Sequence, residues 1–159
     1  MEAKDYLSRL NEILVKKQAM LHEISGFTRL QKEALQSENY NELEVLIAKK
    51  QARIEAVDKL DEQFSVYSER LKSTLGIASF DELPQHSIPG TKELKDNVAG
   101  VFDLLNEIKS LENENTGKMN ADMSKLKDKI KQSNSVKKIN RAYNSPQTGI
   151  MNHYFDKKK

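Results

Sequence analysis

The chain has 159 residues, of which 31% are charged and 6% aromatic, with six glycines, three prolines and no cysteine. This size and composition predict one helical domain rather than a sheet protein, and the absence of cysteine excludes disulfides and thiolate zinc sites. The net charge of +2 is uneven, because residues 1–117 carry −6 (15 Lys/Arg, 21 Asp/Glu), residues 118–141 carry +6 (8 against 2) and the last 18 carry +2 (3 against 1).

Two long amphipathic helices are predicted first, over residues 3–36 and 41–75. Their apolar residues recur at intervals of three, four and seven, the pattern of packed helix pairs. The polar stretch "SENYNE" separates them, and Asn41 followed by Glu44 has the spacing of a capping box. Two such helices joined by a short turn should form an elongated antiparallel hairpin. Three charged residues interrupt the apolar stripes: Lys17, Lys50 and Asp61.

A crossover loop is predicted over residues 76–90, because it contains Pro84, Pro89 and two glycines, although Ser79 could cap a helical turn. A third long helix is predicted over 91–143. Its apolar stripe is interrupted at Glu112 and Asn115. The interruption is either a frayed or kinked zone beyond the end of the partner helix, or a polar layer that lets the helix beyond it detach.

The sequence therefore predicts an all-α fold: an elongated, coiled-coil-like antiparallel hairpin with a third long C-terminal helix. Residues 1–143 should form a single domain and residues 144–159 a flexible tail. The N-terminus has no apolar signal segment, and no window approaches the ~18 apolar residues of a membrane span. We expect a cytoplasmic protein.

Residues that could support catalysis or metal binding are dispersed. His22, His86 and His153 lie on the first helix, the loop and the tail, and none has a partner at metal-ligand spacing. No phosphate-binding glycine loop or nucleophile elbow occurs. The carboxylates alternate with lysines, as on a solvated helix face. We therefore predict no catalytic, cofactor-binding or metal-binding site, and no enzyme activity.

The basic region near the C-terminus raises the possibility of nucleic-acid binding. On a helix, however, Lys125, Lys127, Lys129 and Lys131 would point in different directions rather than cluster on one face. Only Arg141 could make planar bidentate contacts, and no aromatic residue lies among the lysines for base stacking. An acidic protein partner or simple solvation is the preferred interpretation, and we expect no nucleic-acid partner.

The tail ends in an aromatic pair followed by three lysines. It is either a terminus under little selection or a short linear motif, in which aromatic anchors fill a partner's pocket while lysines steer the encounter. The motif comprises Tyr154, Phe155, Lys157, Lys158 and Lys159.

Three stretches carry a resemblance to a known family: "ENYNELEVLIAKKQARIEAVDKL", "LENENTGKMN" and the ending "AYN…YFDKKK". Together with the helical pattern of nearly the whole chain, they resemble the FlgN-type flagellar export chaperones. The resemblance implies a cytoplasmic protein that binds the hook-associated proteins of the hook–filament junction, keeps them soluble and delivers them to the flagellar type III secretion apparatus. Components of that apparatus are a second possible partner, and the resemblance implies no cofactor.

In this family the substrate-binding part lies toward the C-terminal helix. The resemblance therefore implies a client-binding face on the third helix, comprising Val98, Val101, Phe102, Leu105, Ile108, Met119, Met123, Leu126 and Ile130. Methionine repacks easily and suits a surface that accepts more than one partner. The hypothesis is that the third helix packs only partly on the hairpin, and that a client helix completes this incompletely occupied face.

The alternative is a non-enzymatic coiled-coil adaptor or scaffold that dimerises through the same stripes without a secreted client. The sequence leaves open whether the first two helices pair within one chain or between chains, and so leaves the oligomeric state open.

Overall fold

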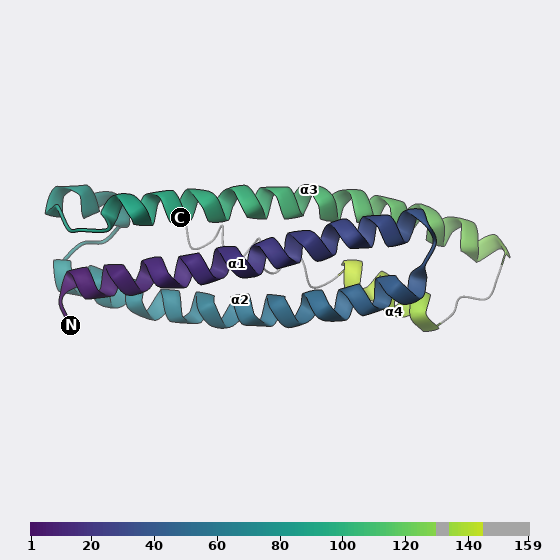
Figure 1. The fold of residues 1–159 in the computed structure, drawn as a ribbon, viewed down its shortest axis with the longest axis horizontal. Coiled ribbons are helices and arrows are strands. Elements are labelled where there is room, and N and C mark those ends of the chain that lie inside the picture. The colour runs from purple at the N-terminus through teal and green to yellow at the C-terminus, as the bar shows by residue number, and fades with distance from the viewer. Residues whose placement is uncertain (130–133, 145–159) are drawn as a thin grey trace.

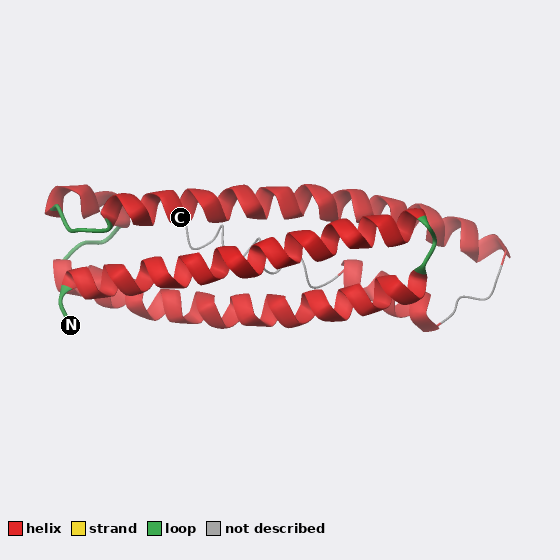
Figure 2. Ribbon diagram, viewed as in Figure 1, coloured by secondary structure: helices red, strands yellow, loops and turns green. Residues whose placement is uncertain are grey.

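The computed structural model describes residues 1–129 and 134–144. Its elements are the helices α1 (Ala3–Gln36), α2 (Tyr40–Leu75), α3 (Thr91–Lys129) and α4 (Asn134–Asn144), with a 3-10 helix, η1 (Phe80–His86), before α3. Every regular element in this part of the chain is helical (Figure 2). The predicted all-α, elongated fold is confirmed.

The three long helices lie side by side (Figure 1). α1 packs against both α2 and α3. α2 runs antiparallel to α1, whereas α3 runs parallel to it (Figure 1). Hydrogen bonds between α1 and the segment from Gly90 onward accordingly join residues with a nearly constant sequence separation, from 78 to 87. The predicted hairpin therefore forms within one chain, and its third helix lies along it.

The turn between α1 and α2 is one residue shorter at its C-terminal end than predicted. Asn39 is the N-cap of α2, and its side-chain oxygen accepts a hydrogen bond from the backbone N–H of Glu42 at 3.2 Å. The predicted capping box at Asn41 is thus wrong, because α2 already begins at Tyr40 and Asn39, two residues before Asn41, is its N-cap. In the crossover, Ser79 and Glu82 form a capping box that starts η1, as the sequence indicated.

The predicted third helix, 91–143, is divided in the structure. α3 ends at Lys129, and α4 is a separate helix that packs on both α2 and α3. Packing α4 back on the bundle buries Ile139 and Tyr143, which a single straight helix would carry away from the other helices. The predicted tail, 144–159, begins at the last residue of α4, Asn144, and residues 145–159 lie outside the described residues.

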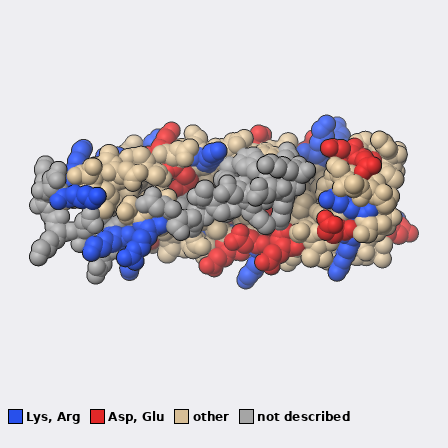
Figure 3. All heavy atoms as spheres, turned by 180° about the vertical axis from the view of Figure 1, so that it is seen from behind, with Lys and Arg blue, Asp and Glu red and all other residues tan. Residues whose placement is uncertain are grey.

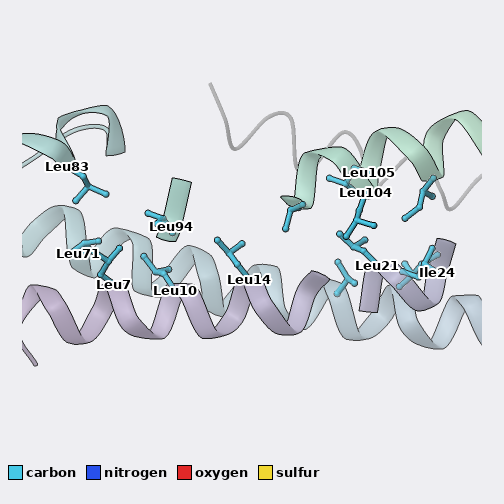
Figure 4. Close-up of a cluster of buried hydrophobic side chains, with 14 residues drawn as sticks. Leu7, Leu10, Leu14, Leu21, Ile24, Leu71, Leu83, Leu94, Leu104 and Leu105 are labelled. Carbon is cyan, nitrogen blue, oxygen red and sulfur yellow. The ribbon is translucent and has the colours of Figure 1, made fainter. Parts of the chain in front are cut away.

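Two groups of buried hydrophobic residues form the core. The first, here called the proximal cluster, combines fourteen residues of α1, α2, η1 and α3, among them Leu7, Leu21, Leu83 and Leu105 (Figure 4). The second, here called the distal cluster, lies at the end of the molecule that carries the α1–α2 turn. It comprises Ala34, Leu35, Leu43, Leu46, Met119, Met123, Ile139 and Tyr143.

Candidate functional site

The residues predicted to form a binding face on α3 are mostly covered by the chain itself. Val98, Phe102 and Leu126 are partly buried, and Ile130 lies outside the described residues. The other five are at most 7% exposed: Val101, Leu105, Ile108, Met119 and Met123. The expectation that α3 packs only partly on the hairpin is therefore wrong for the described residues, because α1 is long enough to cover α3 along most of its length.

The charged residues that interrupt the stripes form buried ion pairs. Lys17 of α1 lies 2.6 Å from Asp61 of α2, and both side chains are at most 5% exposed. Lys50 of α2 pairs with Glu112 of α3, again with both side chains almost wholly buried. Sequence reasoning identified each interruption but did not identify the pairs, since their members lie 44 and 62 residues apart. Charges of opposite sign at stripe positions of different helices were the available signal.

The Lys50–Glu112 pair belongs to a buried layer of polar side chains, here called the polar layer. Lys50 Nζ also donates to Gln31 Oε1 at 2.8 Å, and the Asn115 side-chain amide donates to the Thr28 carbonyl at 3.0 Å. Burial lowers the pKa of Lys50, while the Glu112 carboxylate acts in the opposite direction. The interruption of α3 is thus neither a frayed end nor a kink, since the helix is continuous through a packed polar layer.

The polar layer lies between the two apolar clusters. On α1, Ile24 of the proximal cluster precedes Thr28 and Gln31, and Ala34 of the distal cluster follows them. On α3, the proximal cluster ends at Ile108 and the distal cluster begins at Met119. The bundle therefore has two apolar segments that share continuous helices but have separate cores.

The distal segment is held together by a mixture of apolar and polar contacts. Tyr40 Oη donates to Asp122 Oδ2 at 3.1 Å, which ties the first turn of α2 to α3. Burial and the neighbouring Asp122 carboxylate together raise the pKa of Tyr40 to about 12. Lys118 Nζ lies 2.9 Å from the other oxygen of the same carboxylate.

α4 completes the distal cluster. Its Ile139 and Tyr143 side chains are 1% and 7% exposed. The Tyr143 ring lies over Lys50, with Nζ 5.9 Å from the ring centroid. Burial and the Glu112 charge raise the pKa of Tyr143. Sequence reasoning missed this contribution because residues 91–143 looked like one helix.

The exposed surface at this end of the molecule is basic. Lys and Arg atoms are prominent in Figure 3 near the end that carries α4 and the last turns of α3. Exposed basic residues of the two helices are Lys118, Lys125, Lys127, Lys137, Lys138 and Arg141. His22 and His86 are exposed, and no group of three metal-ligating side chains converges anywhere in residues 1–129 and 134–144.

The comparison with protein families decides the identity of the fold. The family model described as FlgN protein matches residues 1–148. The chain belongs to the FlgN family. FlgN proteins are flagellar export chaperones, so the family that the sequence resembled is confirmed.

The FlgN match spans every described helix, including α4. The predicted tail motif, Tyr154–Lys159, lies beyond both the matched and the described residues. No curated protein and no solved structure matches this FlgN-family chain. Among its described helices, none combines the length and the apolar character that crossing a membrane requires.

Proposed function

We propose that this FlgN-family chain binds the hook-associated proteins of the hook–filament junction in the cytoplasm. It keeps them soluble and delivers them to the flagellar type III secretion apparatus. The proposed client-binding face is the apolar face of α3, and within it chiefly the distal residues Met119, Met123 and Leu126.

The observation that supports this proposal is the division of the bundle at the polar layer, which leaves α3 covered at both ends but gives its distal end the smaller core. The proximal cluster has fourteen buried hydrophobic residues, whereas the distal cluster has eight, two of which come from the short helix α4. The distal face of α3 also presents two methionines, whose flexible side chains repack more readily than leucine. The smaller core, closed partly by a short helix, is the one from which a client can most easily displace the chain's own side chains.

The polar layer also limits how much of α3 a client would have to uncover. Separating α3 from α1 and α2 proximal to the layer would expose the Lys50–Glu112 pair and the larger apolar cluster. Opening only the distal segment keeps the Lys50–Glu112 pair formed and the proximal cluster covered. Polymerising secreted proteins require such cover, because their assembly helices would otherwise associate with one another before export. The client helix then binds by the helix-in-groove mode.

Calorimetric titration of the chaperone with a purified hook-associated protein tests the proposal. The Met123→Asp and Leu126→Asp variants should bind the client at least about tenfold more weakly, a loss of about 1.4 kcal/mol. Asn120→Asp is the matched control, because it places the same carboxylate on an exposed position of α3. Circular dichroism should show unchanged helicity in all three variants.

Two outcomes would contradict the proposal. If the wild-type chain does not bind either hook-associated protein, the proposed clients are wrong. If both distal variants remain folded and bind as tightly as Asn120→Asp, the proposed clients are correct but the proposed binding face on α3 is wrong.

The alternative function, an adaptor that dimerises through the hairpin stripes, has less support. Those stripes are already buried within one chain, with Leu7, Leu43 and Val57 all 0% exposed. Sedimentation equilibrium distinguishes the two proposals, since an adaptor of this kind would dimerise at micromolar concentration without any client.

A further inference from the structure

α4 is attached to the bundle by one narrow face. Its buried side chains are Ile139 and Tyr143, four residues apart and therefore on the same side of the helix. Lys137, Lys138 and Arg141 are exposed. The Lys138–Glu44 ion pair, at 3.2 Å, is largely solvent-exposed on the lysine side and therefore adds little to stability. Among the side chains described for residues 137–143, these two are the buried apolar anchors of α4.

The fit beneath α4 is incomplete at its polar end. Three buried polar atoms have no hydrogen-bond partner among the described residues: Tyr143 Oη, Glu112 Oε2 and Gln31 Nε2. The three residues are at most 7% exposed, and all of them lie around Lys50, which contacts each one. A buried polar atom without a hydrogen-bond partner is unfavourable. α4 therefore covers these atoms, at the place where it packs on α2 and α3, without supplying their missing hydrogen bonds.

We propose that the groove between α2 and the distal half of α3 is the docking site for an amphipathic helix of the client, and that α4 occupies it in the free chaperone. The inference rests on the proposed function, and it adds that α4 competes with the client. The preferred client helix carries an apolar residue at the position of Ile139 and, four residues later, an amide side chain at the position of Tyr143.

The client helix is expected to carry an amide side chain because the groove contains both an unpaired acceptor and an unpaired donor. Glu112 Oε2 is an acceptor that lacks a donor, whereas Gln31 Nε2 is a donor that lacks an acceptor. An asparagine or glutamine side chain has both an N–H donor and a carbonyl acceptor, so one residue can satisfy both atoms. The phenol of Tyr143 forms a hydrogen bond with neither of them. A client helix with an amide therefore gains contacts that α4 does not make, and this difference favours displacement of α4.

A locking experiment tests whether α4 competes with the client. The chain has no cysteine, so Glu44→Cys with Lys138→Cys creates a unique pair at positions whose side chains now meet. A short bis-maleimide linker then fixes α4 in the groove of the full chain. The linked protein should bind a purified hook-associated protein at least about tenfold more weakly than the same variant before linking.

A variant that detaches α4 from the bundle tests the opposite effect, a gain in client affinity. Ile139→Asp places a carboxylate in the distal cluster and should free α4, so that the client binds several-fold more tightly. Lys137→Asp is the matched control on the exposed face of α4 and should not tighten binding. Unchanged affinity in the linked protein would overturn the competition while leaving the proposed function intact. Failure of every form, wild type included, to bind the client would overturn both.

Synthetic peptides test the preference for an amide. A labelled peptide of residues 134–144 and the same peptide with Tyr143→Gln are titrated separately into the full-length Ile139→Asp chain. The peptide with glutamine should bind several-fold more tightly, because it satisfies Glu112 and Gln31. Equal or weaker binding than the native peptide would overturn the preference.

Discussion

The proximal and distal segments of the bundle use the same helices but differ in how their cores are closed. In the proximal segment, η1 places Leu83 against the hairpin and α3, and that side chain is 1% exposed. In the distal segment the closing element is α4, an 11-residue helix whose Ile139 and Tyr143 side chains are buried. One heptad-like pattern can therefore be covered in two ways, by a short 3-10 helix before α3 or by a separate helix that follows it.

The largest effect is expected at the boundary between the two segments. Lys50→Met should lower the free energy of unfolding by about 3–5 kcal/mol, because it leaves the buried Glu112 carboxylate without its partner. Urea denaturation followed by circular dichroism measures the change. Lys49→Met is the matched control, since Lys49 is exposed. A loss below about 1 kcal/mol would show that the pair does not link the segments.

Replacing both members together sharpens this result. Lys50→Met combined with Glu112→Leu should recover most of the lost stability, because no unpaired charge is then buried. A double variant as unstable as the single one would mean that the polar layer contributes through shape rather than through charge.

The next effect compares one residue of each cluster. Leu105→Ala should lower the free energy of unfolding by about 2–5 kcal/mol, the range for truncating a buried leucine. Met123→Ala should fall at or below the lower end of that range, because the neighbouring Met119 and the short α4 can adjust to the space. Equal losses, measured by urea denaturation, would contradict a looser distal segment.

The smallest effect is a pH dependence confined to the distal segment. Because the pKa of Tyr40 is raised to about 12, the folded chain keeps this proton after the unfolded chain has lost it. The contribution is complete below about pH 10 and is lost as the pH rises from 10 to 12. Stability should therefore fall less steeply over this interval in Tyr40→Phe than in the wild type. Identical slopes in urea denaturation series would contradict the role of the Tyr40–Asp122 contact.

Local patterns predicted most of the fold. The bounds of α1 agree with the prediction at both ends, and the capped turn at Ser79 is confirmed. The α2 start was placed one residue late, because two asparagines offered a cap and only packing distinguishes Asn39 from Asn41. The division between α3 and α4 was missed for a related reason. Helical periodicity reports which residues share a face, but it does not report whether a helix continues away from the bundle or returns to it.

The candidate site depended more heavily on long-range contacts. The sequence identified Glu112 and Asn115 as an interruption and Met119 and Met123 as an adaptable face. It offered opposite charges at stripe positions of different helices, but it did not identify Glu112 as the partner of Lys50 or show that Tyr143 would lie over the same layer. It also overestimated how open α3 is, because amphipathicity shows that a face needs a partner without showing which partner covers it.

The amino-acid sequence by itself determined three long amphipathic helices, the hairpin, the capped crossover and the positions where charges enter the apolar stripes. These features depend on spacing along one helix and on residues within a few positions of each other. Only the tertiary structure decided which charges pair, where the core divides and which helix covers the distal face. Those outcomes depend on residues from different helices being buried together, and burial is what makes an unpaired charge or an uncovered apolar face unfavourable.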